Sequence, residues 1–148
     1  MKRIRAAVLM MVVAMVCACG DASEGGDADF PRSTTVTVDG EELSGIDLTT
    51  TSCERADGGA TLRIGDSGIS LGHVYVFVYS DVGLRAAVRI PVDGVRYEAD
   101  SMSQTRGSVT LQRSGEWYRA TGQVVKGSAS TVTRDVPKTF EVIARCVA

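Results

Sequence analysis

Residues 74–79, Val-Tyr-Val-Phe-Val-Tyr, show the strongest preference for a β-strand anywhere in this chain. Valine alternates there with aromatic residues, and both kinds of side chain favour the extended, pleated backbone of a sheet. No polar residue interrupts the run, which is typical of strands that are buried on both faces. We therefore expect 74–79 to be a central strand that is buried on both faces.

Shorter segments on either side of this run alternate between apolar and polar residues with the same period of two. Gly-containing turns separate them, namely Asp39-Gly40, Asp57-Gly58-Gly59 and Val92-Asp93-Gly94-Val95, and the last is a strong hairpin signal. Further strands are predicted at 35–38, 46–53, 60–64, 84–90, 95–98, 108–113, 116–125 and 139–146. Turns at this spacing, with no long helical stripe, predict an all-β domain: an antiparallel β-sandwich or barrel-like domain of about eight short strands.

The chain begins with a pattern of a different kind. Basic residues at 2–5 precede an uninterrupted apolar run at 6–16, which suits a signal peptide and is too short for a membrane span of about 20 residues. The segment Val16-Cys17-Ala18-Cys19 then resembles a bacterial lipobox, with small Ala18 at the cleavage position and Cys19 as the acylated residue. An ordinary secreted protein cut nearby, or a short buried helix, is the alternative.

Acylation at Cys19 would fix both the location and the domain organisation of the chain. Each buried methylene contributes about 0.8 kcal/mol, so the two chains of a diacylglycerol, palmitate among the usual acyl groups, give stable membrane anchoring. Residues 1–18 are then a lipoprotein signal peptide, 19–33 the acylated Cys and a flexible tether, and 34–148 the β domain. We expect an exported protein, lipid-anchored to the cell membrane within the cell envelope.

The charge balance argues against nucleic acid as a partner. All 18 acidic residues but only 13 of the 16 basic residues follow Cys19, so the chain beyond the signal peptide carries a net charge near −5. Such a charge opposes nonspecific binding to nucleic acid.

Two cysteines remain beyond the lipobox, Cys53 and Cys146. Export places them in an oxidising space, where a pair of cysteines usually forms a disulfide. Two free buried thiols, or a bridge to another molecule, are the alternatives that the residues leave open.

The residues that carry chemistry do not assemble into a catalytic or metal-binding set. His73 is the only histidine, whereas a zinc site needs three or four ligands. Gly65-Asp66-Ser67-Gly68 matches the nucleophile motif of chymotrypsin-like proteases, but no histidine precedes it to act as a base. An enzyme would need a carboxylate pair such as Asp66 and Asp81. We expect no enzymatic activity, no metal and no cofactor.

Two groups of side chains are candidates for a binding surface. The aromatic residues could line an apolar pocket or a sugar-stacking surface, or they could pack in the core; they are Tyr75, Phe77, Tyr79, Tyr97, Trp117 and Tyr118. Arg85, Arg89 and Arg96 could form a basic stripe across adjacent strands, or an ordinary solvated face.

Several short segments, taken in order, resemble one known family. They are the lipobox at Cys19, VTVDG at 36–40, GGATLRIG at 58–65, SGEWYRATG at 114–122 and KTFEVIARC at 138–146. The chain resembles the mycobacterial nineteen-kilodalton lipoprotein antigen family, the LpqH-like proteins. The resemblance implies acylation at Cys19, a Cys53–Cys146 disulfide, and a role as a surface antigen that meets host innate receptors or acts in adhesion.

The tether departs from the family pattern. The family's best-known tether is long, Thr-rich and O-mannosylated, whereas this one is short and acidic, with Ser23 and 33–35 as its only hydroxyls. We expect it to carry no O-linked sugar. The sequence thus predicts a non-enzymatic, lipid-anchored envelope antigen that presents a β domain for interaction, or alternatively a lipid- or glycan-binding carrier lipoprotein.

Overall fold

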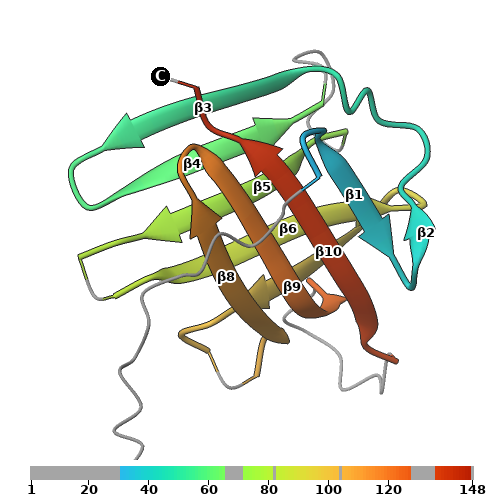
Figure 1. The fold of residues 1–148 in the computed structure, drawn as a ribbon. Helices are drawn as coiled ribbons and strands as arrows, with labels where there is room; N and C mark the ends of the chain where they lie inside the picture. Colours follow the sequence, from blue (N-terminus) through green and yellow to red (C-terminus); the bar gives the residue numbers. More distant parts are fainter. Residues whose placement is uncertain (1–30, 66–71, 82, 104, 128–135, 148) are drawn as a thin grey trace, which may run out of the picture.

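The computed structural model describes residues 31–65, 72–81, 83–103, 105–127 and 136–147 of the chain. They form an all-β fold in which ten antiparallel strands make one curled sheet, a half-barrel (Figure 1). The strands are β1 (Thr35–Val38), β2 (Glu41–Glu42), β3 (Thr51–Ala56), β4 (Gly59–Ile64), β5 (Val74–Tyr79), β6 (Arg85–Val92), β7 (Val95–Asp100), β8 (Ser108–Ser114), β9 (Trp117–Lys126) and β10 (Lys138–Arg145). The predicted all-β, antiparallel, barrel-like class is confirmed, with ten strands where about eight were expected.

The order of strands along the sheet is β2-β1-β10-β9-β7-β6-β5-β4-β3, with β8 paired to β9 beside this path. Strands β3 to β7 form a meander, and β8, β9, β10 and β1 lie across it as a second layer (Figure 1). Strand β9 belongs to both layers. Most of its length pairs with β8 and β10, while Val125 and Lys126 at its end pair with Glu98 and Tyr97 of β7.

A glycine in β9 lets the backbones of β8 and β9 approach closely within the second layer. Gly122 pairs with Phe140 of β10 on one side and with Val109 of β8 on the other. Its φ is +154°, and a Cβ atom there would overlap the carbonyl oxygen of Ser108. Only glycine fits such a contact between backbones.

The interior between the layers is filled with apolar side chains that alternate along the strands. Burying this surface is the main stabilising contribution to such a fold. The largest fully buried side chains are Leu62, Ile64, Ile90, Ile143, Val36, Val74, Val76, Val88, Val124, Val142 and Cys146.

The prediction that 74–79 is buried on both faces was wrong. In β5 the three valines point into the core, whereas Tyr75, Phe77 and Tyr79 are only half-buried on the opposite face. The strand is central in the meander, between β4 and β6, but the curled sheet encloses a single interior. Aromatic side chains can cover a partly solvated face, so a continuous apolar run did not require a second buried layer.

The predicted strand at 46–53 was also wrong over its first half. Strand β3 begins only at Thr51, because the Asp47 carboxylate accepts hydrogen bonds from the backbone N–H of Thr49 at 2.9 Å and from the Thr50 hydroxyl at 3.0 Å. These bonds form a local turn that competes with the extended backbone. They also lower the pKa of Asp47, the bonds from Thr49 most of all.

The other predicted strands are present, with ends shifted by no more than two residues. The predicted hairpin at Val92–Val95 joins β6 to β7, with φ of +51° at Asp93 and +74° at Gly94. Asp39-Gly40 makes a similar turn into the two-residue strand β2, which the sequence did not predict. Within the described residues, no helix is long and apolar enough to span a membrane.

Candidate functional site

A disulfide joins two distant strands of the curled sheet. Cys53 lies in β3, the terminal strand of the meander, and Cys146 follows directly after β10; their α-carbons are 5.1 Å apart. Strands β3 and β10 are not paired with each other, so the bond links two parts of the sheet across its open side (Figure 1). The 93 residues between the two cysteines contain most of the domain.

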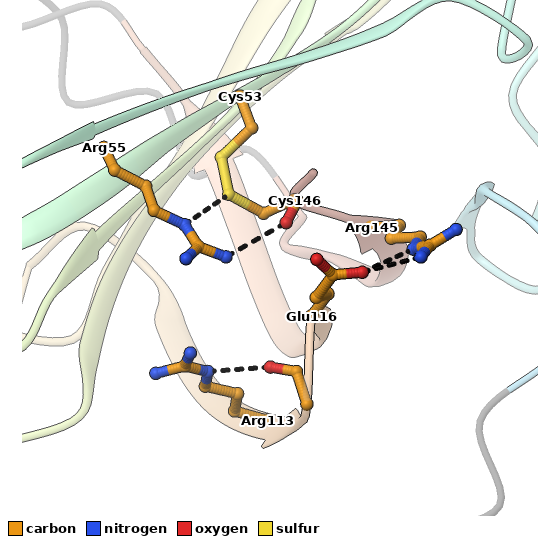
Figure 2. Close-up of a disulfide and its surroundings, with 7 residues drawn as sticks. Cys53, Arg55, Arg113, Glu116, Arg145 and Cys146 are labelled. Atoms are coloured by element: carbon orange, nitrogen blue, oxygen red, sulfur yellow. Dashed lines mark hydrogen bonds and ion pairs between the residues drawn. A yellow bond between two sulfur atoms is a disulfide. The ribbon is translucent and has the colours of Figure 1, made fainter. Parts of the chain in front are cut away.

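Polar contacts surround this bond. The Arg55 guanidinium, two residues beyond Cys53 on β3, donates to the Cys146 carbonyl oxygen at 3.1 Å and to its Sγ at 3.4 Å (Figure 2). The Cys146 N–H donates to the carbonyl oxygen of Glu116, whose carboxylate pairs with Arg145 at 2.6 Å. The end of β10 is therefore held on one side by β3 and on the other by the turn that precedes β9.

A second arrangement lies on the outer face of the meander. The β6–β7 hairpin places Arg89 directly opposite Glu98, and Arg96 lies on the same face. The Glu98 carboxylate is 3.6 Å from Nε of Arg89 and 3.2 Å from Nε of Arg96. Only 16% of the Glu98 side chain is exposed, against 48% and 55% for the two arginines. Glu98 thus holds two guanidinium groups side by side at the surface.

Two further cations complete a hollow of about 540 Å³ around these residues. Arg106 lies in the loop between β7 and β8, and Lys126 is the last residue of β9. We call this hollow the basic groove and define it by Arg89, Arg96, Arg106 and Lys126 with Glu98. Within the part of the chain that the structure describes, neither the Arg106 nor the Lys126 side chain has an ion-pair partner.

Aromatic rings continue the surface on one side of the basic groove. A smaller hollow of about 190 Å³ shares Arg89, Glu98 and Arg106 with the groove and is also lined by Phe77 and Tyr79. The Arg89 guanidinium lies 5.1 Å from the centre of the Phe77 ring, a cation–π contact.

The structure separates the residues that the sequence grouped together. Arg89 and Arg96 meet at Glu98, but Arg85 lies at the other end of β6, opposite Tyr79. The other predicted aromatic residues divide as well. Tyr118 is buried in the core, Tyr97 packs against it, and Trp117 is half-buried at the start of β9.

The predicted residues with reactive side chains form no catalytic arrangement in the described part of the chain. His73 is buried before β5, its ring centroid lies 5.8 Å from that of Tyr75, and neither ring nitrogen has a hydrogen-bond partner among the described residues. No group of three or more His, Cys, Asp or Glu among the described residues could hold a metal ion. Asp66 and Ser67 of the protease-like motif lie outside the described residues, as does Cys19.

The residues of these two arrangements that the sequence did not predict include Glu98, Arg55, Arg106 and Lys126. Glu98 could have been found, because a two-residue turn at Asp93-Gly94 places it opposite Arg89 by register alone. The other three carry no local signal. Arg55, Arg106 and Lys126 reach their positions through contacts between segments that are far apart in the chain.

The family comparison covers the β domain described above. A family model described as the Mycobacterium 19 kDa lipoprotein antigen matches residues 27–146. No curated protein matches the chain. The family match spans well over half of the sequence and includes all ten strands and both disulfide cysteines. The chain therefore belongs to the Mycobacterium 19 kDa lipoprotein antigen family.

Proposed function

We propose that this chain is an exported lipoprotein, anchored in the cell envelope through acyl chains on Cys19, that presents its β domain for interaction. The observation that carries the proposal is the family match over 27–146, preceded by the basic, apolar and Cys-containing segment at 1–19. The family is one of lipoprotein antigens and not of enzymes. Membership implies export and attachment to a membrane through acyl chains.

This proposal assigns a role to each segment of the chain. Residues 1–18 serve as the signal peptide, 19–33 as the acylated Cys and tether, and 34–148 as the displayed domain. The first strand begins at Thr35, so 15 residues separate it from Cys19. Fully extended, such a segment spans about 50–60 Å, which lets the domain stand clear of the membrane.

The displayed domain acts by binding and not by catalysis. Its interior is packed with apolar side chains, and a disulfide ties β3 to the end of β10. Such a domain offers a durable surface outside the cytoplasm. Host innate receptors and adhesion partners are the interactions that we propose for it.

Cell fractionation tests the proposal. The expected result is that the wild-type protein stays with the envelope and is removed by protease added to intact cells. Cys19→Ala should instead release the protein into the medium with the same fold and the same disulfide. Equal retention of both proteins in the envelope would contradict anchoring at Cys19.

A carrier for a lipid or glycan is the second candidate function. The basic groove and the smaller hollow lined by aromatic rings both lie on the outer face, outside the apolar interior. A ligand held there would lie against the outside of the sheet. This observation favours a polar or charged ligand over an acyl chain enclosed in the core.

A further inference from the structure

We propose that the basic groove binds the phosphoryl group of a phosphorylated sugar, with the sugar ring lying over Phe77. This inference deepens the carrier alternative of the proposed function and names its ligand class. It is carried by the charge of the groove, by its shape and by the aromatic surface beside it.

The charge of the groove contrasts with that of the chain. Four cationic side chains and one carboxylate line a single hollow, a local charge of +3 in a chain whose net charge is −2. Arginine guanidinium groups match the geometry of phosphoryl oxygens and can donate two hydrogen bonds at once. A phosphoryl monoester carries a charge of about −1.5 to −2 at neutral pH, which suits this surplus better than a single carboxylate.

The geometry leaves donors available for a ligand. Glu98 contacts Arg89 and Arg96 through their Nε atoms, and no described carboxylate pairs with Arg106 or Lys126. Gly127 lies against Glu98, and a Cβ at this position would be 2.9 Å from the Glu98 carboxyl carbon. Gly127 therefore packs against the Glu98 carboxylate, and this carboxylate positions Arg89 and Arg96. The volume of about 540 Å³ is within the range of small-molecule sites.

The surface next to the cations favours a ring-bearing ligand. Phe77 and Tyr79 line the smaller hollow that shares Arg89 and Arg106 with the groove. Tyr75 and Phe77 are stacked, with ring centroids 5.9 Å apart and planes 8° apart. Asp100, the other acid at this hollow, accepts a hydrogen bond from the N–H of Met102 at 2.8 Å and is thereby engaged with the loop.

Isothermal titration of the mature acylated protein, in neutral detergent micelles, tests the inference. The probes are inorganic phosphate and glucose 1-phosphate. We expect saturable binding of both, tighter for the sugar phosphate and weaker at high salt because the contacts are charged and near the surface. The double variant R106A/K126A should lose about tenfold or more in affinity, since each charged hydrogen bond contributes strongly.

Three further variants separate recognition in the groove from general charge and from misfolding. Phe77→Ala should weaken glucose 1-phosphate and leave inorganic phosphate unchanged. Glu98→Gln removes the charge that positions Arg89 and Arg96, so both probes should bind more weakly than they bind the wild type. Arg85→Ala, an exposed cation on β6 outside the groove, should change nothing. Melting temperatures without ligand verify that each variant is folded.

Several results would overturn the inference. They are the absence of saturable binding, an Arg85→Ala loss equal to that of R106A/K126A, or equal affinity for the two probes. Competition by nanodiscs of phosphatidylglycerol but not of phosphatidylcholine, with no preference for the sugar phosphate, would assign the groove to lipid head groups instead. Acylation of Cys19 is measured separately, so a failure of the groove is distinguishable from a failure of the proposed function.

Discussion

The Arg55 guanidinium holds the residue that directly follows the last strand: it donates to the carbonyl oxygen of Cys146 at 3.1 Å and to its Sγ at 3.4 Å (Figure 2). Among the described strands, β3 forms backbone pairs only with β4, and it is the terminal strand of the sheet path. These two bonds and the disulfide therefore connect the free edge of the meander to the second layer.

Arg55→Ala should lower the free energy of unfolding by about 1–2 kcal/mol, the usual contribution of hydrogen bonds from a charged donor at a partly exposed site. Arg55→Lys should recover little, because an ammonium lacks the planar fork that reaches two acceptors at once. Urea denaturation measures both effects. Glu54→Ala, the adjacent exposed position on β3, is the control and should change stability by less than about 0.5 kcal/mol.

Removing the disulfide should cost much more. Cys53→Ala and Cys146→Ala each free a loop of 93 residues in the unfolded chain, which the entropy model values at roughly 4–5 kcal/mol. We expect each single variant to melt lower by roughly 10 °C or more. Scanning calorimetry of the oxidised wild type and of the variants measures the loss.

The double variant distinguishes the bond from the packing of its two cysteines. Each single substitution already removes the whole disulfide. The double variant should therefore lose little more stability than either single variant. Additive losses would show that each cysteine acts through its own packing. Two thiols that alkylate freely in the native, unreduced protein would contradict the bond itself.

Gly122→Ala, at the one glycine of β9, should be strongly destabilising. The new methyl group would overlap the carbonyl oxygen of Ser108, and this oxygen belongs to a backbone paired in the sheet. We expect a loss of about 3 kcal/mol or more, or no soluble protein, because β8 and β9 must separate. Gly115→Ala is the control. The φ of Gly115 is +59°, but a Cβ atom there would have no atom within 4 Å apart from those of the adjacent residues, so only backbone strain of about 1 kcal/mol is expected. Equal losses would refute the steric explanation.

The link between the β1–β2 turn and β10 should weaken in acid. Lys138 Nζ lies 3.0 Å from an Asp39 carboxylate oxygen, and this hydrogen bond, followed by that from the Thr139 N–H, lowers the pKa of Asp39. A carboxyl whose folded pKa is lowered stabilises the fold above its unfolded pKa of about 4, and the contribution disappears as the pH falls through the folded value.

Asp39→Asn should therefore melt below the wild type at pH 7, and the difference should shrink as the pH falls from about 5 to about 2. Asparagine accepts the positive φ of +53° at this position, so the turn is preserved. Asp93→Asn, with φ of +51° in the β6–β7 turn, measures the effect of the same substitution without the Lys138 hydrogen bond. A difference in melting temperature that stays constant with pH would refute the role of the Asp39 charge.

Local turn chemistry explains why much of the fold was predictable. Asp93-Gly94 sets both the hairpin and the register of β6 and β7, because positive φ at two consecutive residues fixes a tight turn. The burial of the outer face at 74–79 was not predictable in the same way. Whether Phe77 is covered depends on segments far away in the chain, and among the described strands no second layer packs over it.

In the candidate site, too, local contacts could be predicted from the sequence and contacts between distant segments could not. The pairing of Arg89 with Glu98 follows from a short hairpin, whereas Lys126 reaches the groove only because the end of β9 leaves β10 and pairs with β7. That pairing joins segments that are far apart in the chain, which a period of two does not reveal. The Cys53–Cys146 pair was expected because only two cysteines remained beyond the lipobox.

Mass spectrometry of the N-terminal peptide of the mature protein tests the central claim, a lipid anchor on Cys19, most directly. The account predicts that the mature chain begins at Cys19, that this residue carries diacylglycerol, and that the peptide through Arg32 shows no hexose increments. Cys19→Ala should yield no acylated peptide at all. A mature protein that begins elsewhere, or that begins at an unmodified Cys19, would contradict the account.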